Sequence, residues 1–228
     1  MERIILIETS TALCSVALAE NGTVTAYRES SAPKAHASLT AVFVQEILTE
    51  RGISLSECDA VCVSMGPGSY TGLRVGVSTA KGLCFGAGKP LIAVGTLDTL
   101  VAQAASEVHY NDVKYIIPMI DARRMEVYSA VFENGKQITE TAPAIIDETS
   151  FAEYLEQGPC LFIGDGAGKC SDVIKHPNAH FCQCHPKASA MLQPAVQALK
   201  DKRFEDVAYF EPFYLKEFVA TVSKKKLF

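Results

Sequence analysis

RIILIETSTALCSVALAENGTVTAYRE, residues 3–29, decides the fold. An apolar run over 3–8 ends in a polar turn, and a second run over 14–19 leads into Asn21-Gly22. Asn-Gly between two β-type runs is a strong hairpin signal, because both residues tolerate the left-handed backbone of a two-residue turn. The stretch therefore predicts three consecutive antiparallel strands, the third over 24–29.

Helices and strands alternate after this opening. A helix over 36–51 has apolar residues at helical spacing and stops at Gly52, a typical C-terminal cap. A second helix, over 71–86, is apolar or small nearly all round, which is typical of a helix buried on more than one side. The other elements expected in this half are strands at 58–64 and 90–94 and a helix at 96–106.

The same order of elements then restarts. A strand over 114–121 precedes a second over 126–133, a second Asn-Gly at Asn134-Gly135 and a third strand over 136–141. Further elements are expected at 150–157, 160–163 and 187–201. The chain therefore predicts an α/β protein of two βββαβα halves, 1–108 and 109–228, and allows the C-terminal tail to pack back on the first half.

Charge and composition limit the class of function. The chain has 228 residues and a net charge of −5, whereas a protein that holds nucleic acid unaided usually has a basic surplus. We therefore expect any RNA contact to depend on a partner. With neither a secretory signal nor a stretch of membrane-spanning length, the expected location is cytoplasmic. The basic run Lys224–Lys226 is interpreted as a solvated terminus, with an RNA contact as the alternative.

Eight cysteines are best interpreted as small buried apolar residues, since most lie within apolar runs. The one cluster suggestive of a metal is Cys182, Cys184 and His185. Its spacing matches no strong zinc pattern, and strand alternation sends neighbours to opposite faces, so we expect no metal. Asp121 and Asp165 are interpreted as solvated or structural acids rather than a catalytic pair.

Two stretches suit a phosphate. Glu8-Thr9-Ser10 offers a carboxylate and hydroxyls in a turn, and 66–72 offers glycines directly before a helix N-terminus. The plainer interpretations are a polar hairpin turn and a capped strand-to-helix connection. A third stretch, 164–169, is one residue too short for a P-loop, so we interpret it as a flexible turn. The candidate nucleotide or phosphate residues are Glu8, Thr9, Ser10, Gly66, Gly68, Ser69 and Thr71.

Three motifs together resemble one family: IETS at 7–10, GPGSYTGLRVG at 66–76 and IDARRMEVY at 120–128. They closely resemble the TsaB (YeaZ) family, with Glu8 where many relatives carry Asp. The resemblance implies an actin/Hsp70-like ATPase (ASKHA) fold of two ribonuclease-H-like halves. It also implies a role, with TsaD and the ATPase TsaE, in forming threonylcarbamoyladenosine (t6A) at adenosine 37 of tRNA from threonylcarbamoyl-adenylate.

The resemblance implies an accessory subunit rather than an enzyme. The paralogue TsaD carries an H-x-x-x-H metal motif, which falls at about Thr96 and Leu100 of this sequence, and neither side chain binds a divalent metal as His does. We expect no cofactor of its own, with ATP or ADP conceivable only at the TsaD interface. The alternatives are a stand-alone ATPase or small-molecule kinase of the same fold, and a generic dimeric interaction module.

In the family, the helices 36–51 and 71–86 are expected to pack against the equivalent pair of TsaD, or of a second copy, as a four-helix bundle. Small residues would allow close helix approach and larger ones would supply apolar area. The alternative is that both helices simply cover their own sheet. The residues expected at this interface are Leu39, Val42, Phe43, Gly72, Leu73, Gly76, Ala80 and Leu83.

Overall fold

The N-terminal hairpin forms as its Asn-Gly turn predicts. Asn21 and Gly22 have φ of 50° and 77°, and the turn joins strand β2 (Cys14–Glu20) to β3 (Thr23–Ser30). β1 (Arg3–Glu8) pairs antiparallel with β2 and parallel with β4 (Ala60–Gly66), which pairs parallel with β5 (Leu91–Gly95). The computed structural model describes residues 2–107 and 112–216, and this first sheet has the order β3-β2-β1-β4-β5.

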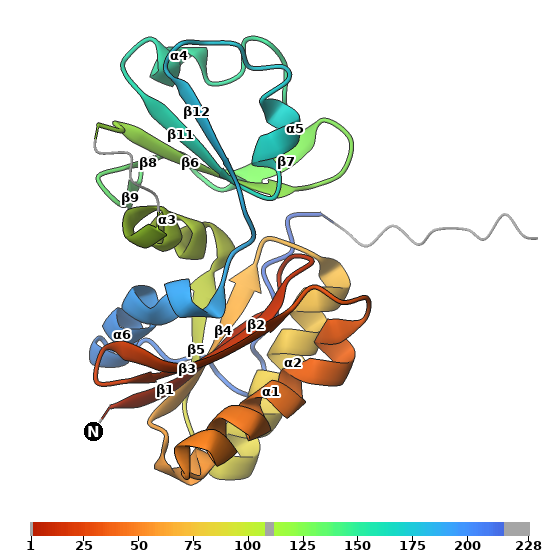
Figure 1. The fold of residues 1–228 in the computed structure, drawn as a ribbon, viewed down its shortest axis with the longest axis vertical. Helices are drawn as coiled ribbons and strands as arrows, with labels where there is room; N and C mark the ends of the chain where they lie inside the picture. The colour runs from red at the N-terminus through yellow and green to blue at the C-terminus, as the bar shows by residue number, and fades with distance from the viewer. Residues whose placement is uncertain (1, 108–111, 217–228) are drawn as a thin grey trace, which may run out of the picture.

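The second sheet repeats that order. Its main path is β10-β7-β6-β11-β12, with β6 and β11 in the central positions that β1 and β4 hold in the first sheet. The predicted duplication is thus confirmed (Figure 1). The strands are β6 (Tyr115–Asp121), β7 (Glu126–Ser129), β10 (Ala142–Ile145), β11 (Cys160–Gly164) and β12 (Ala179–Gln183).

Two strand predictions in the second half are wrong. The run over 126–133 is two strands, because β7 pairs with the end of β6 whereas β8 (Phe132–Glu133) pairs with its start at Tyr115 and Ile116. The run over 136–141 yields only β9 (Lys136–Gln137), which pairs with β8. The third strand of the main path is instead β10, which the sequence interpretation missed.

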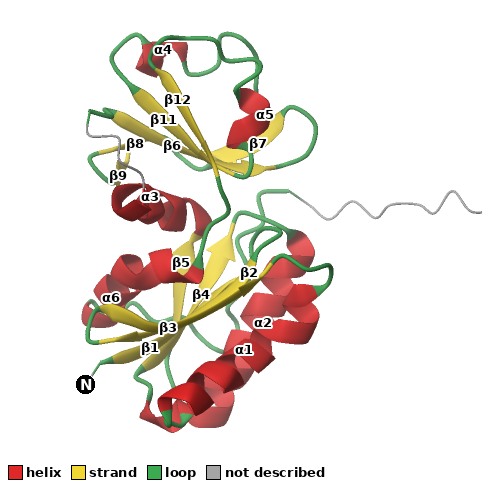
Figure 2. Ribbon diagram, in the orientation of Figure 1, coloured by secondary structure: helices red, strands yellow, loops and turns green. Residues whose placement is uncertain are grey.

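Each sheet is covered by helices on both faces. Helices α1 (Ala35–Arg51) and α2 (Tyr70–Ala87) pack on one face of the first sheet (Figure 2). The other face is covered by η2 (Ala188–Met191) and α6 (Leu192–Lys200). On the second sheet, α4 (Ala152–Leu155) and α5 (Ala167–Cys170) cover one face and α3 (Thr96–Glu107) the other.

Two helices therefore pack on the sheet of the other half. α3 follows β5 of the first sheet but packs on the second, and α6 follows β12 of the second sheet but packs on the first. The predicted division at 108/109 and the basic run Lys224–Lys226 lie outside the described residues. Within 2–107 and 112–216, no helix combines the length and apolar character needed to cross a bilayer.

Helix α2 contacts the β1–β2 turn at two glycines. A Cβ on Gly72 would lie 2.1 Å from the backbone oxygen of Thr9, and one on Gly76 would lie 2.1 Å from Thr9 Oγ1. Both distances are far below van der Waals contact, so only glycine permits this approach. On the outward side of the same helix, Gly82 has no neighbour within 4 Å of its would-be Cβ.

We predict opposite effects for two glycine-to-alanine changes in α2. Gly72→Ala should destabilise the protein by about 1–3 kcal/mol or more, because its methyl group would overlap the Thr9 carbonyl. Gly82→Ala should stabilise it by up to about 1 kcal/mol, because alanine favours an open helix position. Urea unfolding of both variants measures this, and equal effects would contradict the packing described here.

Candidate functional site

The β1–β2 turn buries a carboxyl group among hydroxyls. The Glu8 side chain is fully buried at the end of β1, and its Oε1 accepts a 2.6 Å hydrogen bond from the Ser10 backbone N–H. The Thr9 backbone N–H donates to Ser64 Oγ at 3.3 Å. Among the described residues, four buried side-chain oxygens in this turn have no hydrogen-bond partner: Glu8 Oε2, Thr9 Oγ1, Ser10 Oγ and Thr11 Oγ1.

Burial controls the protonation of Glu8. Desolvation raises the pKa of its carboxyl to about 7, although the hydrogen bond from the Ser10 backbone N–H favours the ionised form and acts in the opposite direction. A buried carboxyl without a cationic partner is costly to ionise. Glu8 therefore titrates near neutral pH.

The loop after β4 closes directly on this turn. The Ser69 backbone N–H donates to the Ser10 carbonyl at 2.6 Å, and a Cβ on Gly68 would lie 2.4 Å from the same oxygen. Gly66, with φ of 111°, is covered by the Phe213 carbonyl, which would lie 2.8 Å from its Cβ. The structure thus brings the two predicted phosphate stretches together, and its own backbone occupies the approach that these glycines permit.

Two of the predicted phosphate-binding residues remain at the surface. Ser69 caps α2, its Oγ accepting a hydrogen bond from Gly72 N–H at 3.3 Å, and both Ser69 and Thr71 are exposed. Hydroxyls at a helix N-terminus suit a phosphate group, whereas Glu8, Thr9 and Ser10 are buried. Nucleotide or phosphate binding by these residues stays a prediction.

The equivalent end of the second sheet holds a network that the sequence did not reveal. The Asp121 backbone N–H donates to Asp165 Oδ1 at 2.9 Å, and burial raises the pKa of Asp165. Lys169 Nζ pairs with the Asp121 carboxylate, and His185 Nδ1 lies 3.9 Å from Asp165 Oδ2. The loop over 164–169, interpreted as a flexible turn, instead contains α5 and this lysine.

A metal site is not assembled from these side chains. The part of the chain that the structure describes contains no group of three His, Cys, Asp or Glu placed to hold an ion. All eight cysteines lie within the described residues and none is in a disulfide; six are buried, and Cys182 and Cys184 are half-buried against the core of the second sheet. The interpretation of the cysteines as apolar packing is confirmed for the six.

Four predicted interface residues are inside the molecule. Leu73 and Ala80 are 1% and 0% exposed, and Gly72 and Gly76 contact Thr9. Phe43 on α1 is also buried at 8% exposure, in the core between the helices and the first sheet. The structure therefore does not expose Phe43 and Leu73 as apolar area, nor Gly72, Gly76 and Ala80 for close approach of a partner helix, because all five pack against the chain's own sheet and turn.

The outward side of the helix pair nonetheless exposes two large apolar side chains, Val42 and Phe85, among polar ones. Leu39 and Leu83 are half-buried and pack at the edge of the core between the helices and the first sheet, whereas Val42 is 41% exposed. Phe85, which the sequence interpretation missed, is 86% exposed, and Gly82 and Gly86 have open space around them. Helical spacing from the buried positions of α2 was the signal that could have placed Phe85 on this side. We call Leu39, Val42, Gly82, Leu83, Phe85 and Gly86 the outer helix surface.

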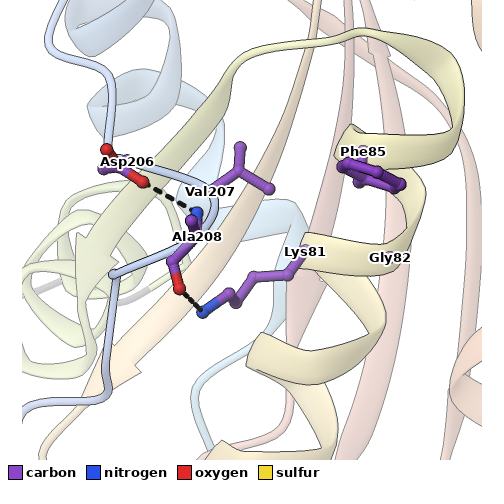
Figure 3. Close-up of a pocket in the computed structure, with 6 residues that line it drawn as sticks. All are labelled: Lys81, Gly82, Phe85, Asp206, Val207 and Ala208. Carbon is purple, nitrogen blue, oxygen red and sulfur yellow. Dashed lines mark hydrogen bonds between the residues drawn. The ribbon is translucent and has the colours of Figure 1, made fainter.

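A shallow pocket extends the outer helix surface toward the C-terminal segment. Lys81, Gly82 and Phe85 line it from α2, opposite 206–208 (Figure 3). Lys81 Nζ donates to the carbonyls of Ala208 and Phe210, both at 3.0 Å, and the Asp206 carboxylate accepts from Ala208 N–H. The two Lys81 bonds attach the segment to α2. The Phe85 ring lies at the edge of this pocket and stays exposed.

Comparison with solved structures defines the class of protein. The activator of 2-hydroxyisocaproyl-CoA dehydratase from Clostridium difficile, solved with bound ADPNP, shares the fold at a TM-score of 0.51 and 8% identity, over 88% of this chain and 96% of that one. YeaZ from Pseudomonas aeruginosa matches at a TM-score of 0.81 with 28% identity, over 94% of this chain and all of that one. The fold is the actin-like ATPase (ASKHA) fold.

Sequence comparison identifies the family within that class. The family model described as TsaD, tRNA N6-adenosine threonylcarbamoyltransferase, matches residues 29–224. The tRNA threonylcarbamoyladenosine biosynthesis protein TsaB of Escherichia coli is 35% identical over 96% of both chains, and that of Bacillus subtilis is 32% identical over 75% of both. The chain belongs to the TsaB family of tRNA threonylcarbamoyladenosine biosynthesis proteins.

We predict that stability falls as pH rises because of Glu8. Its folded-state pKa of about 7 exceeds the ordinary 4.5, so between these values the unfolded chain releases a proton that the folded chain keeps. The loss should approach about 3 kcal/mol. Glu8→Gln should remove this component, leaving a variant more stable than wild type at pH 8 and similar at pH 4.5. Thermal unfolding across pH measures it, and parallel pH profiles would contradict the assignment.

Proposed function

We propose that this chain is a non-catalytic subunit of the complex that forms t6A at adenosine 37 of tRNA from threonylcarbamoyl-adenylate. The positions expected to carry the metal-binding histidines of TsaD are Thr96 and Leu100, both fully buried. Leu100 packs into the core of the second sheet, where a metal ligand would have no access to substrate. The transfer chemistry is therefore assigned to TsaD, with TsaE as a further partner.

The outer helix surface is the proposed docking site for TsaD. Val42 and Phe85 expose apolar side chains, and Gly82 and Gly86 leave room for a close approach. Exposed apolar area of this kind is typical of protein–protein interfaces. The same surface could pair two copies of this chain when TsaD is absent. This exposed apolar surface is the observation that carries the proposal.

We propose that a nucleotide binds only at the interface between this chain and TsaD. Ser69 and Thr71 present hydroxyls at the N-terminus of α2, while Gly66 and Gly68 are covered by the chain's own carbonyls. ATP or ADP would thus meet this chain at the edge of the loop, next to TsaD. The tRNA is bound by the complex rather than by this chain alone, in keeping with the net charge of −5 and a cytoplasmic location.

A stand-alone ATPase or kinase is the second candidate, since the fold is shared with an ADPNP-bound protein. The covered glycines argue against it, because the Phe213 and Ser10 carbonyls already lie against Gly66 and Gly68, on the side where the missing side chains would leave room for a ligand. Magnesium-dependent ATP turnover by the purified chain separates the candidates. We expect a rate near background, and a rate of several turnovers per minute would favour the enzyme.

We predict that Val42→Asp weakens the complex with TsaD at least about tenfold without unfolding the chain, because a charge would enter an apolar contact. Val42 is 41% exposed, so the monomer should keep its melting temperature. Co-purification and isothermal titration with TsaD measure the effect. Leu73→Asp is unsuitable, because Leu73 is buried and its replacement tests the fold.

Ile145→Asp is the matched control for this experiment. Ile145 lies on β10 of the second sheet, is 78% exposed, and receives the same apolar-to-acidic change away from the helix pair. It should bind TsaD as wild type does. If Val42→Asp also pairs normally, or if Ile145→Asp is equally weakened, the outer helix surface is not the docking site.

A further inference from the structure

The turn between β6 and β7 holds two consecutive arginines in an unfavourable backbone. Arg123 and Arg124 have φ of 71° and 50°, in the left-handed region that glycine and asparagine enter easily and other side chains enter at a cost. The other turns of this kind, at Asn21-Gly22 and Asn134-Gly135, carry the residues that suit them. Strained residues kept at an exposed turn point to a use for their side chains.

The ammonium group of Lys169 holds the backbone of this turn in place, and we call this set of contacts the Lys169 clamp. Lys169 Nζ donates to the carbonyls of Arg124 and Glu126, both at 2.7 Å, and pairs with the Asp121 carboxylate. The same carboxylate accepts the Arg123 backbone N–H at 2.9 Å. All three donors of one ammonium group are therefore used to hold the turn in place, and the two arginine side chains project from a fixed base.

The guanidinium groups of this turn stand apart from the other arginines. Arg3, Arg28, Arg51 and Arg203 form ion pairs, and Arg74 lies 4.1 Å from the centroid of the Tyr70 ring. Within the described residues, neither the Arg123 nor the Arg124 side chain forms a hydrogen bond or an ion pair, and both are exposed. Two unpaired cations are thus presented together on a protein with an overall negative charge.

The acids of the turn are engaged by lysines. Asp121 pairs with Lys169, and Glu126 pairs with Lys216. Asp165, which accepts the Asp121 N–H, is largely buried. Strand β10 lies beside the turn, with the exposed Ile145 paired to Glu126 and the exposed acids Asp147 and Glu148 just after it. Residues 122–125 themselves expose no large apolar side chain.

We propose that the Arg123–Arg124 turn binds backbone phosphates of RNA within the assembled complex. Guanidinium groups donate paired hydrogen bonds to phosphate oxygens, and a nucleic acid backbone repeats such anions at regular spacing. An open turn fits an extended polyanion better than a small ligand, which would need an enclosing pocket. The inference rests on the proposed function, because the chain's net charge requires a partner to supply the rest of the RNA affinity.

The test uses the complex of this chain with TsaD and fluorescently labelled, unmodified tRNA, with the dissociation constant measured from about 50 to 200 mM salt. Replacing both residues, Arg123→Gln with Arg124→Gln, should weaken tRNA binding roughly tenfold at low salt. It should also reduce the slope of log affinity against log salt by about 1–2, one for each lost phosphate contact. Complex formation, measured first by size-exclusion chromatography, should be unchanged.

Three further variants test whether a loss of tRNA affinity comes from the arginine side chains themselves, rather than from misfolding or from a general loss of positive charge. Arg123→Gly with Arg124→Gly should raise or preserve the melting temperature, because glycine suits positive φ, and should still lose tRNA affinity. Lys169→Met keeps both arginines but removes the clamp, and should lose part of the affinity. Arg203→Gln, which removes one exposed positive charge elsewhere, should change affinity by no more than about twofold.

The outcomes distinguish this inference from the proposed function. If the complex forms and the glutamine variant binds tRNA with wild-type affinity and salt slope, the RNA contact is wrong and the accessory function stands. If an acidic protein partner, rather than tRNA, loses affinity, the turn is a protein-docking site and the inference is also overturned. If the wild-type chain forms no complex with TsaD, the proposed function fails and the RNA contact fails with it.

Discussion

The contact between Thr9 and two glycines of α2 is the constraint that holds the N-terminal half of the fold together. Because Gly72 and Gly76 have no side chains, α2 lies directly against the β1–β2 turn, and its apolar inner side fills the core beside the first sheet. Ser69, at the start of the same helix, then reaches the Ser10 carbonyl. Turn, loop and helix are fixed as one unit.

The same close packing fills the space beside the loop glycines and the β1–β2 turn. In this chain, Gly68 and Gly66 permit the close approach of the Ser10 and Phe213 carbonyls. The hydroxyls and the carboxyl of the turn are buried with unpaired oxygens, and Glu8 gains a pKa near neutrality as a consequence. With its inner side occupied, α2 has its outward side free for a partner.

The sequence predicts the fold well where local chemistry decides it. Both Asn-Gly hairpins, the Gly52 cap and the repeated order of elements are confirmed. The split between β7 and β8 could not be predicted, because it depends on which part of β6 each strand pairs with. The packing of α3 on the second sheet and of α6 on the first likewise could not be predicted, because the spacing of apolar residues shows that a helix is buried but not which sheet it covers.

The candidate sites were predicted less completely, for related reasons. A helix that is apolar nearly all round does not say which side faces its own sheet, so Gly72 and Leu73 were assigned to the wrong side and Phe85 was missed. Positive φ at Arg123 and Arg124 gives no signal in sequence, because arginine does not favour it. The contact between Ser10 and Ser69 joins two motifs that lie about 60 residues apart, so only the folded structure shows it.

The most direct measurement titrates this chain into a reaction containing TsaD, TsaE, tRNA and threonylcarbamoyl-adenylate, with t6A quantified by mass spectrometry of nucleosides. A non-catalytic subunit must act stoichiometrically, so the rate should rise with added chain and level off at equimolar TsaD. Full rate at trace amounts of the chain, or a rate independent of it, would contradict the account.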